Sequence, residues 1–351
     1  MAALPFHRID AAGDSWTADR PLVTSGAYRL ATWRLNDYAQ LTRNPNWLGP
    51  SKLVPEIIWR PMEDALSAMR LMLAGGADTV ADYPAARHAW LLQHHRELVH
   101  ATPYLGSYYF VFNTRVKPFD DVRVRTALAM TIEQRWIAEK LFGTGLLPAW
   151  GFLPPGIDDA QPYQPVWQDW SRARRLAQAA QMLRSAGYGP SRPLRFEIRF
   201  NSSAEHRRVA VALAAMWRPL GVEVSLFNSE AALHFAALRQ HQFQLARSGW
   251  IADLPISENF LAVHRMSNGA GNYSGYSSPA YDSALDRALS LADPKQRATA
   301  MRQAEKLIMQ DMPILPIYYY ATRNLVAPRI SVWRDNVSNV HPSRTLRIVA
   351  P

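Results

Sequence analysis

Helix-like and strand-like patterns alternate between residues 171 and 248, and this alternation restricts the possible fold more than any other feature of the sequence. The pattern predicts helices at 171–186, 205–218 and 230–240, and strands at 194–200, 222–227 and 243–248. Strands that alternate with helices are typical of an α/β domain, in which helices cover a sheet. The sequence therefore predicts the α/β class.

The flanking segments add strands, helices and one long loop. Period-two spacing at 25–30 and 38–43 predicts a β-hairpin, and the acidic pair Asp120 and Asp121 suits a helix N-terminus, where unpaired N–H groups favour negative charge. Five prolines make 143–168 an expected irregular loop. The remaining expected elements are strands at 56–60, 108–113 and 314–320, and helices at 64–74, 121–141, 279–292 and 294–310.

Composition excludes several classes of protein. The chain has no cysteine, which rules out disulfides, thiol nucleophiles and thiolate metal sites. Its 39 basic and 29 acidic residues give a net charge of +10, but the arginines are spread in short clusters such as Arg123 with Arg125. We interpret them as a solvated surface and expect no nucleic-acid partner. No apolar run approaches the ~20 residues of a membrane-spanning helix.

The first eight residues lack the charged, apolar and small-residue regions of a secretory signal. As written, the chain is expected to stay in the cytoplasm.

The sequence contains no recognisable catalytic or cofactor-binding motif. The histidines His94, His95 and His100 lack the spacing of a zinc site, and the glycines at 269–275 miss the dinucleotide-binding spacing by one residue. No nucleophile has an evident base. The sequence therefore predicts no enzyme, no cofactor and no metal.

Polar and aromatic residues instead gather at strand ends and in loops. They supply a carboxylate for an ammonium, an arginine for a carboxylate, and aromatic faces that bury apolar area. Together they are the ingredients of a cleft that binds a zwitterion. The residues are Tyr108, Tyr109, His206, Arg247, Trp250, Asp253, Tyr273, Tyr276 and Tyr318 to Tyr320.

Several motifs, in order, resemble the oligopeptide-binding proteins of bacterial ABC importers, extracellular solute-binding protein family 5. The resemblance runs from about Gly13 to the end of the chain. The stretches that carry it are Ser25-Gly26-Ala27-Tyr28, Arg43-Asn44-Pro45-Asn46-Trp47, residues 108–113, residues 118–128, residues 247–253, Tyr273-Ser274-Gly275-Tyr276 with Tyr281-Asp282, and residues 316–320.

This resemblance implies a bilobed, periplasmic-binding-protein-like (type II) fold with an incomplete first lobe. The remainder of that lobe is expected at 5–105, the peptide-binding lobe at 106–320, and the return segment at 321–351. It implies short peptides as ligands, an ABC permease and ATPase complex as partners, and a periplasmic location. Family members carry a longer N-terminal part with a signal peptide, so this chain is expected to be truncated.

The resemblance also implies roles for six residues. Asp253 matches the carboxylate that pairs with the peptide α-ammonium, and Arg247 and His206 match positions that meet the peptide carboxylate. Trp250 and Tyr109 match aromatics that line the cleft, and Tyr319 matches a position at the return crossover. The peptide backbone is expected to be held by strand addition, with roomy hydrated pockets that make affinity largely independent of sequence.

Other interpretations stay open at this point. Asp253 is also placed to cap the turn before Pro255, Arg247 to pair with a neighbouring acid, and His206 to lie on the surface at a helix start. Val111 stands where the family commonly has an acidic residue, which weakens an expectation of basic side chains. The alternatives in function are a degenerate fragment that binds nothing and the ligand-sensing domain of a regulator, although no helix-turn-helix pattern with a basic recognition helix occurs.

Overall fold

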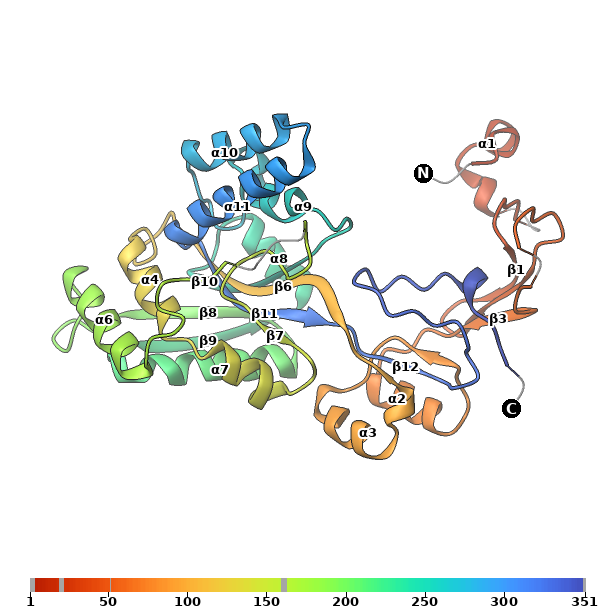
Figure 1. The fold of residues 1–351 in the computed structure, drawn as a ribbon, viewed down its shortest axis with the longest axis horizontal. Coiled ribbons are helices and arrows are strands. Elements are labelled where there is room, and N and C mark those ends of the chain that lie inside the picture. Colours follow the sequence, from red (N-terminus) through yellow and green to blue (C-terminus); the bar gives the residue numbers. More distant parts are fainter. Residues whose placement is uncertain (1–3, 19–21, 51, 159–162, 350–351) are drawn as a thin grey trace. The chain divides into compact units, whose positions relative to one another are not determined.

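The computed structural model describes residues 4–18, 22–50, 52–158 and 163–349. The chain forms two compact units (Figure 1). The smaller unit comprises Met1–Thr102 and Thr322–Pro351, and the larger unit comprises Pro103–Ala321. The chain therefore passes between the units twice.

A mixed six-stranded sheet forms the centre of the larger unit, with strand order β7-β11-β6-β10-β8-β9. Strand β8 is parallel to both β9 and β10, whereas β6 is antiparallel to both β10 and β11. The strands are β6 (Pro103–Phe112), β7 (Leu147–Pro148), β8 (Arg195–Asn201), β9 (Glu223–Ser229), β10 (Leu245–Ile251) and β11 (Ile314–Ala321).

Two crossover helices cover this sheet from opposite sides. Helix α7 (Ala204–Trp217) connects β8 to β9, and α8 (Ala231–Arg239) connects β9 back to β10 on the other side of β8. Because crossovers between parallel strands are right-handed, a reversal of direction along the sheet moves the helix to the opposite face. Figure 1 shows α7 and α8 on opposite sides of the strands.

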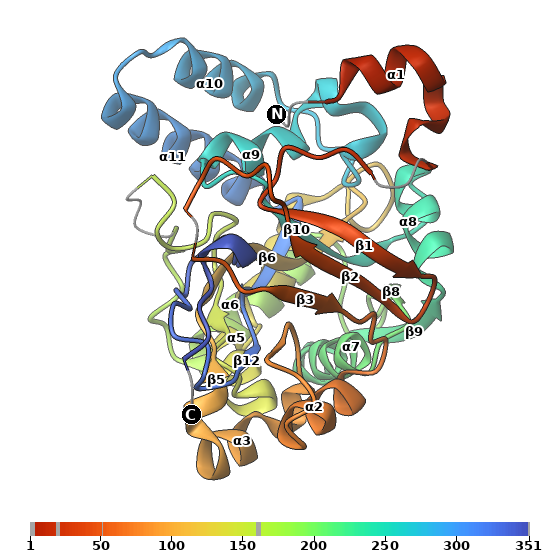
Figure 2. The same ribbon diagram turned by 90° about the vertical axis from the view of Figure 1, so that its right-hand side faces the viewer.

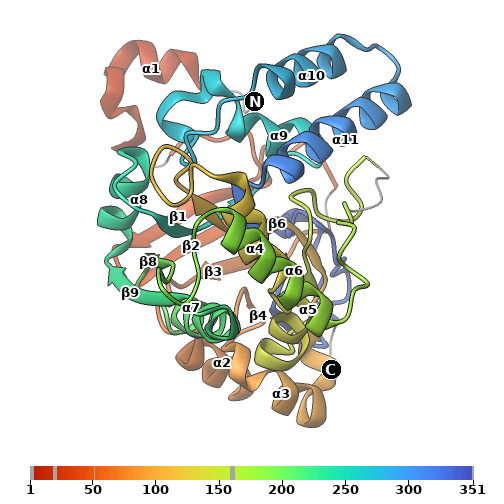
Figure 3. The same cartoon turned by 90° about the vertical axis from the view of Figure 1, so that its left-hand side faces the viewer.

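Four of the other helices of the larger unit pack as two pairs. Helix α4 lies beside α6, as Figure 3 shows, and α10 packs against α11. Asp121 caps α4, since its Oδ1 accepts a hydrogen bond of 2.8 Å from the backbone N–H of Arg123. The helices are α4 (Val122–Met130), α5 (Gln134–Trp136), α6 (Arg172–Ser185), α9 (Ser257–Leu261), α10 (Pro279–Ser290) and α11 (Pro294–Asp311).

The continuous helix expected at 121–141 is wrong. It breaks after Met130 and resumes as α5 and a π-helical turn, η4 (Ile137–Phe142). Arg175 compensates for the break, because its Nη1 donates hydrogen bonds of 3.0 and 2.9 Å to the carbonyl oxygens of Met130 and Ile132. Its Nη2 also contacts the Glu133 carboxylate at 2.6 Å. A side chain 43 and 45 residues away thus satisfies carbonyls that a continuous helix would pair internally.

The smaller unit holds two three-stranded sheets, with strand orders β1-β2-β3 and β4-β12-β5. Figure 2 shows β1, β2 and β3 side by side, and the expected hairpin is present as the antiparallel pair of β1 and β2. The elements are α1 (Phe6–Ala12), β1 (Tyr28–Arg34), β2 (Tyr38–Arg43), β3 (Glu56–Trp59), α2 (Ala65–Leu73), β4 (Thr79–Val80), α3 (His88–His94), β5 (Val99–His100) and β12 (Asn324–Val326).

The returning chain completes the core of the smaller unit. Strand β12 inserts between β4 and β5, and buried Leu325 packs in a cluster with Met69, Met72 and Leu91. The two segments that connect the units are hydrogen-bonded to each other, because the Thr322 N–H donates a 2.8 Å hydrogen bond to the Thr102 carbonyl. The two ends of the larger unit are therefore held next to each other.

A buried carboxylate fixes the loop that follows β7. Glu305 on α11 is 2% exposed, and its Oε1 accepts hydrogen bonds of 2.8 and 2.9 Å from the N–H groups of Phe152 and Leu153. Burial raises the pKa of Glu305 to about 7, although the two N–H groups oppose the shift. Removal of this carboxylate from water therefore outweighs its hydrogen bonds.

The raised pKa makes stability depend on pH. In the folded protein Glu305 binds its proton more tightly than an exposed glutamate does, so its contribution is fully present below about pH 4.5 and is lost as the pH rises through about 7. Glu305→Gln keeps an acceptor oxygen but cannot ionise. We expect the free energy of unfolding of the wild type, relative to this variant, to fall by about 3 kcal/mol between pH 4 and pH 8. Urea unfolding at each pH measures this difference, and parallel pH profiles for the two proteins would contradict the assignment.

Candidate functional site

Strand β10 carries two of the six predicted site residues, and strand geometry separates them. Arg247 lies opposite Phe110 of β6, and Trp250 lies opposite Ser107. Side chains alternate between the faces of a strand, and directly opposed residues share a face. Arg247 therefore projects with Tyr108 on the first face of the sheet, whereas Trp250 projects with Tyr109 on the second.

Arg247 on the first face has neutral partners. Its Nη2 donates a 2.8 Å hydrogen bond to the Tyr320 hydroxyl, and its Nη1 donates a 3.3 Å bond to Oδ1 of Asn201. Its guanidinium carbon lies 4.8 Å from the ring centre of Tyr108, within the range of a cation–π contact. Among the residues that the structure describes, no carboxylate forms an ion pair with Arg247. The expected alternative of a neighbouring acid is therefore not observed.

Glycine at position 249 makes this arrangement possible. A Cβ on Gly249 would lie 2.7 Å from the Tyr320 hydroxyl oxygen and 3.4 Å from Nη2 of Arg247. The first distance is shorter than a van der Waals contact. Any side chain at 249 would therefore displace the tyrosine that orients Arg247.

His206 also lies on the first face, at the start of α7. Its Nδ1 is 3.3 Å from the Tyr108 hydroxyl, within hydrogen-bonding distance, and the ring centres of the two residues are 5.5 Å apart. Burial, assisted by the positive charge of Arg247, lowers the pKa of His206 to about 3. At neutral pH Arg247 is therefore the charged member of this pair, and His206 offers a hydrogen bond without charge.

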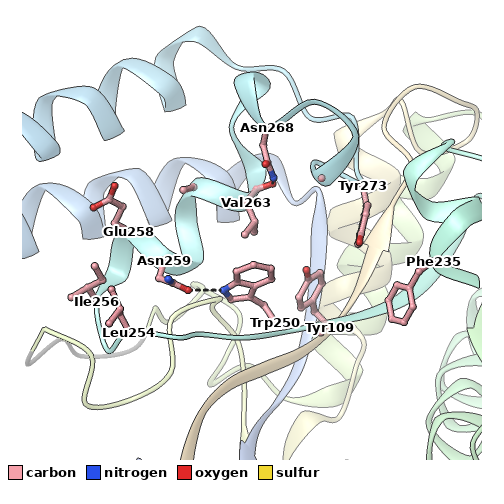
Figure 4. A pocket seen from close by; sticks show the side chains of 13 residues that line it. Tyr109, Phe235, Trp250, Leu254, Ile256, Glu258, Asn259, Val263, Asn268 and Tyr273 are labelled. Carbon is pink, nitrogen blue, oxygen red and sulfur yellow. Dashed lines mark hydrogen bonds between the residues drawn. The ribbon is translucent and has the colours of Figure 1, made fainter. Parts of the chain in front are cut away.

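A cavity of about 700 Å³ opens on the larger unit beside Trp250 (Figure 4). The Trp250 Nε1 donates a 3.2 Å hydrogen bond to Oδ1 of Asn259 on α9, which fixes the indole at the cavity wall. Volumes of ~300–1,000 Å³ are typical of ligand sites. The aromatic lining consists of Tyr109, Phe235, Trp250 and Tyr273, and the aliphatic lining of Leu254, Ile256, Ala262 and Val263.

Tyr109 and Tyr319 lie on the second face of the sheet, and both contact buried groups of the larger unit. The Tyr109 ring packs edge-on against Phe152 and His264, at ring-centre distances of 5.2 and 6.0 Å. Tyr319 is 2% exposed, and its hydroxyl donates a 3.1 Å hydrogen bond to the Gly151 carbonyl. Segment 151–153, which Glu305 also anchors, thus supports Tyr109 through the ring of Phe152.

Asp253 follows the last residue of β10 by two positions and is exposed. In the described parts of the chain, neither backbone nor side-chain groups donate a hydrogen bond to its carboxylate. The turn at this point is closed by the Ile256 N–H, which bonds to the Leu254 carbonyl at 2.9 Å. A cap by the Asp253 carboxylate on this turn is therefore not observed among the described residues.

The structure brings the predicted residues together in two groups. Arg247 and His206 meet around Tyr108, Trp250 and Tyr109 line one cavity, and Asp253 lies three residues beyond Trp250. The sequence did not reveal Asn259 or Phe235 as cavity residues. Neither belongs to a recognisable motif, and only the fold brings α8 and α9 to the same opening.

Over the described residues, no group of three or more His, Cys, Asp or Glu side chains is placed to hold a metal ion. No described helix is long and apolar enough to cross a membrane.

Comparison with known proteins identifies the family. Residues 1–272 match the bacterial extracellular solute-binding proteins, family 5 Middle. The chain belongs to this family. Its members bind solutes, and this membership agrees with the prediction that the chain is not an enzyme.

Curated relatives of family 5 match nearly all of this chain but only part of their own length. The chain is 32% identical over 346 residues to the periplasmic oligopeptide-binding protein OppA of Salmonella typhimurium, covering 97% of this chain and 64% of that protein. It is 34% identical over 353 residues to the periplasmic murein peptide-binding protein MppA of Escherichia coli, covering 99% and 66% respectively. The chain thus spans about two thirds of the length of these relatives.

Solved structures of similar proteins agree with this family membership. The Escherichia coli murein tripeptide binding protein MppA superposes with a TM-score of 0.84 at 33% identity, covering 99% of this chain and 69% of that one. Haemophilus influenzae OppA, in complex with the peptide RPPGFSPFR, gives a TM-score of 0.81 at 29% identity, covering 99% and 69%. These likenesses confirm the predicted α/β fold of the periplasmic-binding-protein kind.

The contact around Gly249 leads to a stability prediction. Gly249→Ala would place a methyl group against the Tyr320 hydroxyl, and we expect it to destabilise the protein by about 1–3 kcal/mol through overpacking. Gly189→Ala is the matched control, because a Cβ there meets nothing nearer than 4.0 Å. Urea unfolding of both variants provides the measurement. Equal stabilities for the two variants would show that the Tyr320 position is not constrained by residue 249.

Proposed function

We propose that this chain is the peptide-binding component of an ABC-type oligopeptide importer and that it binds short peptides with a free amino end. In this proposal Asp253 binds the α-ammonium, Arg247 with His206 binds the carboxylate end, and Trp250 and Tyr109 line the site. Tyr319 supports Tyr109 through segment 151–153. The partners would be an ABC permease and ATPase complex, and the location would be the periplasm, as in relatives named for that compartment.

One observation carries the proposal. Asp253 is exposed and has no hydrogen-bond partner among the described residues, and it directly precedes Leu254, which lines the cavity. A carboxylate that takes no part in its own fold is available for a ligand. An ammonium is the complementary group, and a charge-assisted hydrogen bond contributes roughly 1.5–3 kcal/mol.

The surroundings of Arg247 support the proposal that it binds the carboxylate end of the peptide. Its Nε has no hydrogen-bond partner among the described residues, and the Asn201 and Tyr320 groups that its guanidinium contacts are neutral. A cation withdrawn from water without a counter-ion is costly. A peptide carboxylate would supply the missing charge.

Strand geometry limits the length of peptide that both ends can hold. Asp253 follows Arg247 by six positions, and at 3.2–3.4 Å per residue their Cα atoms are at most about 20 Å apart. An extended peptide has a similar rise per residue. An extended peptide of about six residues is therefore long enough to engage both groups.

The relatives agree with a peptide ligand by their names, which specify oligopeptides and murein peptides. The alternatives are a degenerate fragment without binding activity and the ligand-sensing domain of a regulator. Native mass spectrometry of the purified chain separates the first of these from the proposal. A co-purified peptide supports binding, whereas a folded protein that holds no peptide and binds none on titration is a degenerate fragment.

Asp253→Asn tests the ammonium contact. The variant keeps the size of the side chain but removes its charge, so we expect affinity for Ala-Ala-Ala to fall about 10- to 100-fold with little change in stability. Isothermal titration with free and N-acetylated Ala-Ala-Ala measures the effect. The wild type should prefer the free peptide, and the variant should lose most of that preference.

Asp169→Asn is the matched control, since Asp169 is also an exposed acid of the larger unit. It should titrate like the wild type. Identical titration curves for wild type and Asp253→Asn would overturn the assignment of Asp253.

A further inference from the structure

We propose that the cavity beside Trp250 selects the side chain of the peptide's first residue, and that it favours a large aromatic side chain and rejects an acidic one. This inference rests on the proposed function, because it takes the peptide ammonium to lie at Asp253. It differs from the sequence-independent affinity that the family resemblance implies.

The position of the cavity points to the first residue. Leu254 and Ile256, one and three positions after Asp253, line the cavity, and so does Trp250, three positions before it. The first side chain of a peptide branches from the carbon atom that bears the ammonium. A peptide anchored at Asp253 therefore presents this side chain nearest to the cavity.

The lining favours aromatic side chains. Eight of the thirteen lining residues are aromatic or aliphatic, and two are glycines that leave space. An aromatic side chain buries ~150–250 Å² and gains further from edge-to-face contact with other rings. The aromatic and aliphatic groups meet in one opening, as Figure 4 shows for Trp250, Tyr109, Phe235 and Val263. A ring entering here exchanges water for apolar surface.

The walls are also formed before a ligand arrives. Asn259 holds the indole of Trp250, and Phe152 and His264 pack against the ring of Tyr109. Pre-organised walls lose little conformational freedom when a ligand binds. The apolar gain is therefore retained as affinity.

Charge explains the rejection of acidic side chains. Glu258 is the one formally charged residue in the lining, and no arginine, lysine or histidine lines the described cavity. An acidic side chain would therefore leave water without meeting a cation in the described lining. The volume of about 700 Å³ exceeds what one side chain needs, so the selection acts through chemistry rather than size.

Titration calorimetry of the full chain with four tripeptides tests the proposal. We expect Phe-Ala-Ala to bind at least about tenfold more tightly than Ala-Ala-Ala, and Glu-Ala-Ala at least about tenfold more weakly. Ala-Ala-Phe checks the position, and it should show much less of the aromatic gain. A gain of equal size for Ala-Ala-Phe would overturn the assignment to the first residue.

Peptide binding and the selectivity of the cavity are tested by different outcomes. If the folded chain binds none of the four peptides, the proposed function fails. If it binds all of the first three with equal affinity, peptide binding stands and the selectivity proposed for the cavity is wrong.

Discussion

The alternation of side chains along β10 is the constraint on which the site depends. One strand delivers Arg247 to the first face of the sheet and Trp250 to the second, and it ends two residues before Asp253. Its neighbour β6 does the same with Tyr108 and Tyr109. A shift of register by one residue would exchange the two groups. Strands β11 and β8 flank β6 and β10 on either side and help to hold that register, although β8 pairs with β10 only at Leu245 and Ala246.

Two charged residues of the candidate site, Asp253 and Arg247, have no ion-pair partner among the described residues. In many α/β domains acids and arginines pair with each other, as Arg175 and Glu133 do here. Neither Asp253 nor Arg247 has such an ion pair among the described residues. The guanidinium of Arg247 contacts tyrosine side chains instead. A zwitterionic ligand would complete both.

Much of the fold was predictable because its elements carry local signals. The alternation at 171–248 gave α6, β8, α7, β9, α8 and β10 to within a few residues, and Asp121 caps α4 as its charge indicates. The break after Met130 was not predictable, because the group that satisfies its carbonyls, Arg175, comes from a distant helix.

Only those site residues that belong to recognisable sequence motifs were predictable. The stretch 247–253 pointed to Arg247, Trp250 and Asp253, but their separation by face follows from pairing with β6, which periodicity alone does not specify. Asn259 and Phe235 reach the cavity through the packing of α8 and α9 around the sheet. Contacts between elements distant in sequence therefore account for what sequence reasoning missed.

A crystal structure of the chain with a bound tripeptide tests the central claim most directly. We expect the peptide ammonium to lie within about 2.7–3.2 Å of a carboxylate oxygen of Asp253. An ammonium that lies against another group, while the Asp253 carboxylate contacts only solvent, would contradict it.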